Sequence, residues 1–195
     1  NAVLFFRPLR RCYRHLADWE ETAGGGYPPN ELWLCGSALI HRAPKKWFHQ
    51  TRLPNGNSWY NNEIQHYTNR MQNSYISDGT LKIVAIRESF TDQNRTKQFT
   101  SARLNSKYAF TYGRVDVKAK LPQGFGTWPA IWMLGKNINE NGGYWQTQGF
   151  GTTYWPATGE IDIMEHWGSR EQNYVSSALH TPSSSGNTYN VGGQY

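Results

Sequence analysis

The sequence has little of what marks several large classes of protein. Only 17% of its 195 residues are charged, and no apolar run approaches the length of a membrane span. The formal net charge is +6, but it is spread thinly, because residues 51–195 hold thirteen basic and ten acidic side chains. A surface that binds nucleic acid needs a denser basic stripe. We therefore expect no nucleic-acid partner and no membrane partner.

Cysteines and metal-binding motifs are scarce as well. Cys12 and Cys35 are too few for a disulfide framework, and neither has the partners of a zinc site. The metalloprotease pattern H-E-x-x-H does not occur. The opening NAVLFF is too short for the apolar region of a signal peptide. We expect no catalytic metal and no required cofactor.

Aromatic residues and short strand patterns are abundant instead. Aromatics make up 15% of the chain, with nine Trp and twelve Tyr, which suits a β-rich protein with an aromatic groove. Four segments favour strands, the first of them directly after an Asp78–Gly79 turn: residues 80–89, 110–122, 127–135 and 173–181. Residues 136–159 and 182–195 favour loops. Strands at short intervals with little helical periodicity predict an all-β, antiparallel β-sandwich.

The stretch GEIDIMEHWG (159–168) places three acids within six residues. On a regular strand Glu160 and Asp162 share one face, while Glu165 falls on the other. On a helix Glu160 and Glu165 would stand roughly 140° apart. One extra residue, a β-bulge at Ile163 or Met164, brings all three acids to one face. The cluster therefore predicts a bulged strand with a catalytic face.

Two plainer interpretations of this cluster stay open. Acids at alternate strand positions are commonly a solvated face. Asp162, Glu165 and His166 could also ligate a cation, although adjacent Glu165 and His166 face opposite ways on a strand. The surrounding aromatics and glycines favour a sugar-binding cleft over both.

GEIDIMEHWG, with TYGRVDVKAKLPQGFGTWPAIWMLG upstream and WYNNEIQHYTNR before that, resembles glycoside hydrolase family 16. The extra residue before Glu165 is similar to the laminarinase (endo-β-1,3-glucanase) branch. The resemblance implies a concanavalin-A-like jelly roll whose later strands are missing here, with residues 47–195 as a partial catalytic domain. Residues 1–46 do not resemble the family's usual opening. A reading-frame error or a foreign junction upstream of Lys45 would make that segment non-native.

The resemblance also assigns roles to the three acids. It implies that Glu160 is the nucleophile and Glu165 the acid/base of a retaining glycosidase. Asp162, between them, would share a proton with Glu160 and hold it oriented. Three neighbouring acids cannot all ionise comfortably, so at least one pKa must rise.

Five further residues are candidates for substrate binding. Trp128 and Trp132 lie four apart, so on one strand they would share a face and could stack on glucose, with core packing as the alternative. By resemblance, Arg103 and Asn62 would bind glucose hydroxyls on the non-reducing side, unless they are surface or turn residues. His180 resembles a family residue near the leaving group, although a lone His is commonly structural.

The implied substrate is a laminarin-like β-glucan, cleaved at internal β-1,3 linkages. Alternatives within the fold are mixed-linkage glucan, agarose or carrageenan as substrate, and transglycosylation as reaction. A non-catalytic, lectin-like β-glucan-binding module is the alternative of another class. The resemblance further implies an extracellular or periplasmic monomer, with a structural calcium ion as an option.

Overall fold

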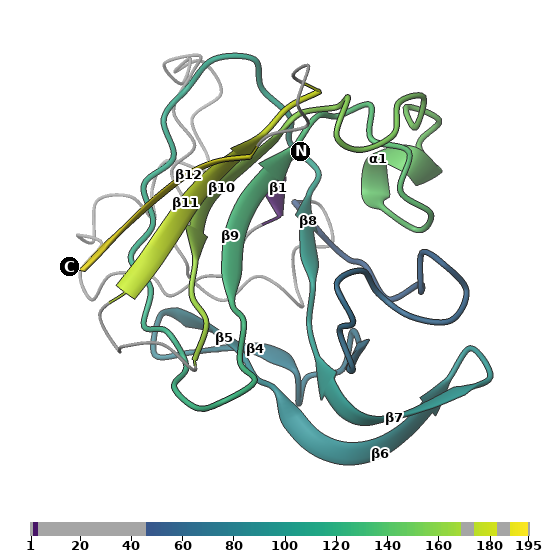
Figure 1. Cartoon of the computed structure of the whole chain (residues 1–195). Helices are drawn as coiled ribbons and strands as arrows, with labels where there is room; N and C mark the ends of the chain where they lie inside the picture. The colour runs from purple at the N-terminus through teal and green to yellow at the C-terminus, as the bar shows by residue number, and fades with distance from the viewer. Residues whose placement is uncertain (1, 4–45, 169–173, 183–187, 195) are drawn as a thin grey trace, which may run out of the picture.

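The computed structural model describes residues 2–3, 46–168, 174–182 and 188–194, and these form β-strands with one short helix (Figure 1). The largest sheet has seven strands in the order β12-β11-β10-β9-β1-β8-β2. Its strands are antiparallel, which confirms the predicted all-β antiparallel fold class. In that order their bounds are Thr188–Gln194, Tyr174–His180, Glu160–Glu165, Ala130–Leu134, Ala2–Val3, Leu104–Ser106 and Trp47–His49.

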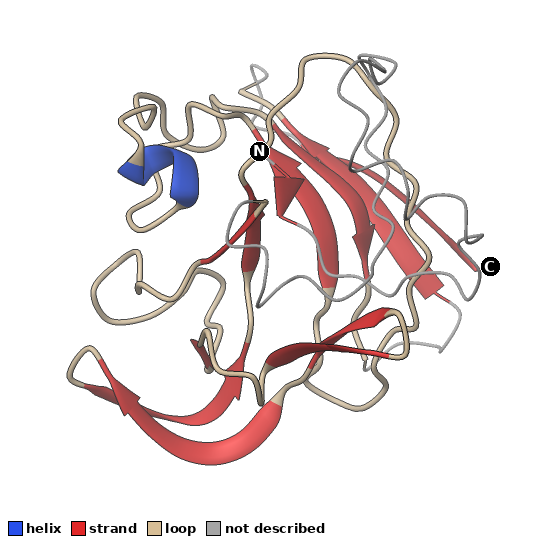
Figure 2. Cartoon of the chain, turned by 180° about the vertical axis from the view of Figure 1, so that it is seen from behind, coloured by secondary structure: helices blue, strands red, loops and turns tan. Residues whose placement is uncertain are grey.

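The remaining strands form two smaller sheets beside the large one. A three-stranded sheet has the order β3-β7-β6, and its long, curved β6–β7 hairpin is prominent from behind (Figure 2). A two-stranded sheet pairs β4 with β5. The bounds of β3 to β7 are His66–Tyr67, Ser74–Ser77, Thr80–Ile83, Ile86–Asp92 and Arg95–Ser101, and helix α1 covers Tyr144–Thr147.

An apolar layer lies on one face of the large sheet. Ile131 of β9 is buried there, and partly buried hydrophobic side chains from β9 itself and three other segments pack against it: Met133, Trp47, Val115, Val117, Ile163 and Met164. These residues include both residues that separate Asp162 from Glu165. The opposite face of β9 and β10 is therefore left for the acids.

A buried polar network ties residues 136–159 to the sheet. Asn105 of β8 donates to the side chain of Gln50, and its own carbonyl oxygen accepts the backbone N–H of Tyr144, both at 3.0 Å. The backbone N–H of Gln50 in turn donates to the carbonyl of Arg103. This network fixes the start of α1 against β8, and the rest of the segment follows from there to β10.

Several sequence predictions are confirmed. The Asp78–Gly79 turn has positive φ at both residues and joins β4 to β5. Strands β9 and β11 lie within the predicted ranges 127–135 and 173–181. The predicted strand 80–89 is real but interrupted, because Val84 and Ala85 separate β5 from β6.

Two predictions about secondary structure are wrong. Residues 182–195 were expected to form a loop, but β12 pairs with β11 over its whole length. Residues 110–122 were expected to form a strand, yet residues 115–122 form none. Val115 and Val117 still alternate with exposed Asp116, so the pattern reports which side chains face the core. It does not report whether a partner strand completes the hydrogen bonds.

Of the first 46 residues, the structure describes Ala2, Val3 and Lys46. Residues 4–45, with Cys12 and Cys35, lie outside the described residues. Ala2 and Val3 form β1, which pairs with Met133 and Trp132 of β9 and with Asn105 of β8. No helix in the described ranges is long and apolar enough to span a membrane.

The interior beneath β8 supplies a test of the fold. Leu104 is 0% exposed, so Leu104→Ala should lower the free energy of unfolding by about 2–5 kcal/mol through lost contacts and a residual cavity. Urea unfolding followed by tryptophan fluorescence measures the change. The matched control is Leu179→Ala on β11, where the side chain is 44% exposed and the expected change is within about 0.5 kcal/mol. Equal losses in the two variants would contradict this packing.

Candidate active site

Strand β10 contains the predicted bulge. Against β9, Asp162 faces Trp132 and Met164 faces Ile131, so two steps on β10 match one step on β9. Against β11, Asp162 faces Ala178 and Glu165 faces Ser176. The extra residue is thus Ile163, one of the two predicted positions. It restores the parity of the strand, so that Glu160, Asp162 and Glu165 share one face.

Asp162 is the centre of the acid cluster. His180 lies on β11 directly opposite Glu160, and its Nε2 is 2.9 Å from Oδ2 of Asp162 and 3.7 Å from Oε1 of Glu160. Glu160 and Asp162 are close enough that each shifts the pKa of the other. The Asp162 side chain is only 4% exposed, so its partners come from the protein.

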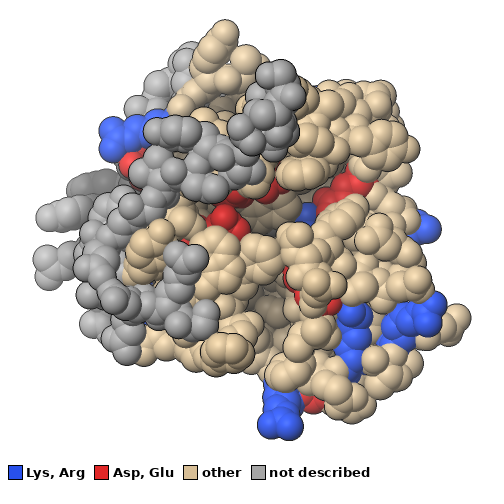
Figure 3. All heavy atoms as spheres, viewed as in Figure 1, with Lys and Arg blue, Asp and Glu red and all other residues tan. Residues whose placement is uncertain are grey.

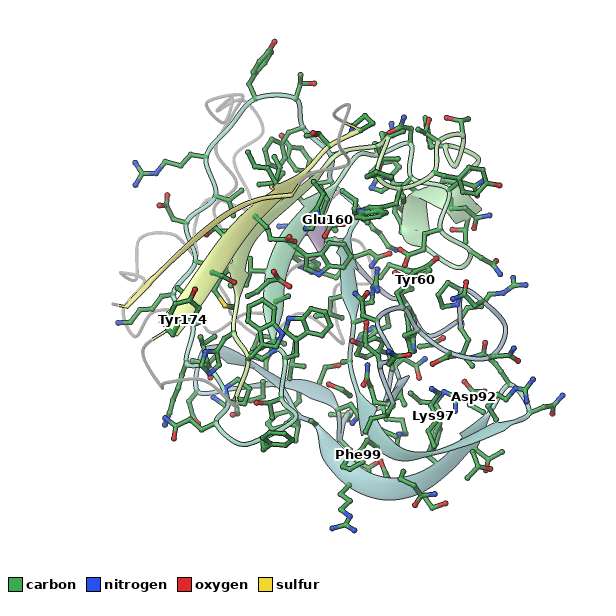
Figure 4. The ribbon with its side chains drawn as sticks, in the orientation of Figure 1. Tyr60, Asp92, Lys97, Phe99, Glu160 and Tyr174 are labelled. Atoms are coloured by element: carbon green, nitrogen blue, oxygen red, sulfur yellow. The ribbon has the colours of Figure 1, made fainter. Side chains whose placement is uncertain are left out.

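Each glutamate accepts a hydrogen bond from a tryptophan. Nε1 of Trp128 donates to Oε1 of Glu165 at 3.1 Å, and Nε1 of Trp155 donates to Oε2 of Glu160 at 2.8 Å. Trp128 also stacks on Trp167, with ring centroids 5.8 Å apart. Glu160 lies at the end of β10 next to residues 136–159 (Figure 4). Acidic atoms line a hollow near the middle of this face (Figure 3).

Local structure brings Trp128 to Glu165. Thr127 closes a turn on the carbonyl of Gly124, and Gly168 donates its backbone N–H to the carbonyl of Thr127. A Cβ at Gly168 would meet the Gly124 carbonyl oxygen and the Thr127 hydroxyl at 2.1 Å, so only glycine allows this approach. The segments before β9 and after β10 are therefore held together, and both lead into the site.

Burial, as the largest cause, and the charges of Glu160 and Glu165 together raise the pKa of Asp162 to about 8. The hydrogen bond with Glu160 acts in the same direction. Because Glu160 and Asp162 interact strongly, the proton belongs to the pair, and Asp162 is where the environment favours it. At neutral pH a protonated Asp162 can donate a hydrogen bond to a charged Glu160.

Burial also raises the pKa of both glutamates. Four neighbours lower the pKa of Glu160: His180, Trp155, Asp162 and Arg103. For Glu165 the Trp128 hydrogen bond and His180 lower the pKa, whereas the charge of Glu160 raises it. Glu160 thus has more support for its charged form. One glutamate that is charged and one that holds a proton are what glycoside hydrolysis requires.

Arg103 lies beside the site in a buried ion pair. Both carboxylate oxygens of Glu140 are 2.9 Å from its Nη2. Its guanidinium carbon lies 5.1 Å from the ring centroid of Trp59 and 4.8 Å from that of Trp132. These contacts exclude the alternative that Arg103 is a surface residue. They also place it behind Trp132, the cross-strand neighbour of Asp162.

The other predicted binding residues take different positions. Trp128 precedes β9, which begins at Ala130, so the argument that Trp128 and Trp132 alternate along one strand is wrong. Asn62 is exposed in a turn with φ of 59°. His180 contacts Glu160 and Asp162. The substrate-binding roles of these residues stay predictions.

Sequence reasoning left three residues of the site out of the candidate set. Trp155 lies in the glycine-rich loop of residues 136–159, where its aromatic character indicates a place along the cleft but no contact with Glu160. Glu140 and Trp59 surround Arg103 from segments far apart in the sequence. No local pattern connects them.

A cation could find ligands at the cluster. One donor atom from each of Glu160, Asp162 and His180 lies within 4.8 Å of the others. The candidate ligand His166, by contrast, is buried, and its Nδ1 lies 2.7 Å from the carbonyl of Tyr174. His180 and Asp162 already hydrogen-bond to each other, and Trp155 binds Glu160. That no metal takes part in catalysis stays a prediction.

Comparison with known proteins agrees with this geometry. The profile of the glycosyl hydrolases family 16 matches residues 61–194. Glucan endo-1,3-β-glucosidase A1 of Niallia circulans is 45% identical over 127 residues, which are 63% of this chain and 17% of that protein. A β-glucanase of Rhodothermus marinus is 40% identical over 141 residues, which are 71% of this chain and 43% of that protein.

A solved structure is similar as well. A LamA variant from Zobellia galactanivorans, in complex with laminaritriose and laminaritetraose, matches with a TM-score of 0.71 and 52% identity, over 78% of this chain and 61% of its own. The chain belongs to glycoside hydrolase family 16. It spans less than half the length of the two curated relatives above.

The raised pKa of Asp162 makes stability depend on pH. That pKa is about 8 in the folded chain and about 3.9 in the unfolded chain. Between these values the folded state binds one more proton than the unfolded state, so the free energy of unfolding falls as pH rises from about 4 to about 8. We expect Asp162→Asn to reduce that fall by at least about 1 kcal/mol.

Urea unfolding at a series of pH values from 4 to 8 measures this effect. The matched control is Asp116→Asn, because Asp116 is exposed and pairs only with exposed Arg114 among its described contacts. This variant should keep the wild-type dependence. A curve for Asp162→Asn that runs parallel to the wild type would show that another group titrates.

Proposed function

We propose that the protein is a retaining glycoside hydrolase that cleaves internal β-1,3 linkages of a laminarin-like β-glucan. The observation that carries this proposal is the bulge at Ile163, which brings Glu160, Asp162 and Glu165 to one face of the sheet. Relatives whose names include endo-1,3-β-glucosidase support the choice of linkage.

In the first step the Glu160 carboxylate attacks the anomeric carbon, and the bond to the leaving oxygen breaks. Glu165 transfers its proton to that oxygen, and a covalent glycosyl ester on Glu160 remains. The protonated Asp162 donates to Glu160 and steadies it for attack. Burial keeps the pKa of Glu165 raised, which favours the proton it must give.

In the second step the same residues act in reverse. Glu165, now a carboxylate, removes a proton from water, and the resulting hydroxide oxygen attacks the anomeric carbon. The ester bond breaks, Glu160 leaves as a carboxylate, and the sugar keeps its original configuration. Two inversions at one carbon therefore need only the two glutamates and water.

The aromatic residues around the cluster suit a sugar chain. We assign Trp132 to the floor of the cleft, beside Asp162. We assign Trp128, which stacks on Trp167, to the leaving-group side next to Glu165. Indole faces pack on the C–H-rich faces of glucose. Asn62 stays assigned to the non-reducing side, and Arg103 to the same side through its support of Trp132. His180 stays assigned to the leaving-group side.

The wider assignments follow from the family. The partner is a polysaccharide, and the protein acts as a monomer outside the cytoplasm, in the extracellular space or the periplasm. No cofactor is required, and a structural calcium ion is compatible with the proposal. Mixed-linkage glucan, agarose and carrageenan are the other substrates to assay.

Removing either catalytic carboxyl group should abolish hydrolysis. We expect Glu160→Gln and Glu165→Gln to lower the release of reducing sugar from laminarin by at least about a thousandfold. Circular dichroism should show an unchanged fold, and Asp116→Asn serves as the matched control with wild-type activity. Wild-type rates from either glutamine variant would contradict the proposal. Binding of laminarin without cleavage by the wild-type chain would favour the lectin-like alternative.

Azide should distinguish the two glutamates by the configuration of the product. In Glu160→Ala azide can replace the nucleophile and attack directly, so an activated β-glucoside substrate should give the inverted α-glycosyl azide. In Glu165→Ala azide attacks the glycosyl ester on Glu160 and should give the β-glycosyl azide. Proton NMR of the anomeric hydrogen reads the outcome. Exchanged configurations would mean that the roles of the two glutamates are exchanged.

A further inference from the structure

The two proposed catalytic glutamates are held in the same way, and one of the two donors has no role so far. Trp128 holds Glu165 and was a candidate from the sequence, whereas Trp155 holds Glu160 at 2.8 Å. An indole N–H is a donor only, and it does not ionise. Its bond to a carboxylate oxygen therefore favours one orientation of the group and its charged form.

Trp155 is 54% exposed, but the backbone around it is fixed. Thr153 bonds to residues 137 and 139 through backbone hydrogen bonds of 3.0 and 2.7 Å, and its hydroxyl accepts from Asn137 at 2.9 Å. On the other side of Trp155, Gly159 closes a turn on the carbonyl of Pro156 at 2.9 Å. The indole thus projects from a short segment that is tied at both ends and enters β10 directly.

The ring of Trp155 also covers the imidazole behind the nucleophile. Its centroid lies 5.6 Å from that of His180, with the ring planes inclined at 53°. His180 in turn contacts Asp162 and approaches Glu160. Trp155 therefore meets the Glu160 carboxylate from the loop side, while His180 and Asp162 meet it from the sheet.

We propose that Trp155 is a positioning residue for the nucleophile: its indole N–H holds Oε2 of Glu160 and fixes the orientation in which the carboxylate attacks. This inference rests on the proposed function. Trp155 acts through Glu160, in contrast to a residue that only stacks on sugar. A stacking residue would change substrate affinity, whereas a positioning residue changes the rate of the chemical step.

The charges around Glu160 explain why such a donor matters. Glu165 and Asp162 lie on the same strand, His180 faces Glu160 from β11, and Arg103 acts from the segment before β8. Burial opposes the charged form of Glu160. The Trp155 bond is among the contacts that lower the pKa of Glu160. Losing it should therefore raise that pKa.

The test compares Trp155→Phe with wild type on laminarin. Phenylalanine keeps an aromatic ring for sugar stacking and removes only the donor. We expect kcat to fall about tenfold, the effect of roughly one lost charged hydrogen bond, with KM changed less than twofold. The acidic limb of the pH profile of kcat/KM reports the free nucleophile, so it should move to higher pH.

Two further variants make the result specific. Trp145→Phe is the matched control, because the Trp145 indole nitrogen is buried and has no acceptor among the described residues. It should leave the acidic limb in place. Trp128→Phe removes the donor to Glu165, so it should move the alkaline limb to higher pH instead. A higher KM with an unmoved acidic limb in Trp155→Phe would overturn the proposal and assign Trp155 to sugar stacking.

A measurement without turnover separates this inference from the proposed function. Carbon NMR titration of chains labelled at the glutamate carboxyl carbon, with Glu160→Gln for assignment, gives the pKa of Glu160 directly. Trp155→Phe should raise it, and Trp145→Phe should not. If the wild-type chain hydrolyses no glucan, the proposed function fails, but the titration still decides whether Trp155 holds Glu160. An unchanged pKa in Trp155→Phe would refute the contact.

Discussion

The extra residue at Ile163 determines where every later side chain of β10 points. Without it, Glu165 would turn toward the layer that contains Ile131 and Met133, and Met164 would take its place among the acids. A carboxylate in that apolar layer would have no polar partner and would cost several kcal/mol. The bulge therefore satisfies the core and the site at once, because the same shift packs Met164 into the apolar layer and turns Glu165 toward the other acids.

The three neighbouring carboxyl groups of the site cannot all be charged at once. The neutral hydrogen-bond donors around them help to decide which of them carries the charge. Burial favours the protonated form of all three acids, while the indole of Trp155 favours charge on Glu160. Asp162 is enclosed most completely and keeps the proton. The division of roles therefore follows from unequal surroundings of chemically similar groups, as it does wherever two carboxyl groups must act as base and acid.

Local patterns predicted the parts of the molecule that local sequence controls. The alternation around Glu160 and the parity of Glu165 predict the bulge, and the apolar run over residues 127–135 predicts β9. The sequence does not indicate strand β12, because its seven residues include two glycines and only Thr188, Tyr189 and Val191 favour a strand. Its ladder depends on pairing with β11. The position of His180 opposite Glu160 depends on the register between two strands, which no single segment encodes.

Arg103 lies beside the proposed site, but its contacts favour a role other than direct binding of sugar. Its Nη2 is committed to both oxygens of Glu140, and aromatic rings cover it from Trp59 and Trp132. A glucose hydroxyl would have to compete with a buried ion pair, and breaking such a pair leaves an uncompensated charge. The geometry therefore favours a supporting action, in which Arg103 ties the loop that carries Glu140 to the sheet. It thereby holds Trp132 in place beside Asp162. Arg103 would then affect a bound sugar only by positioning the indole of Trp132.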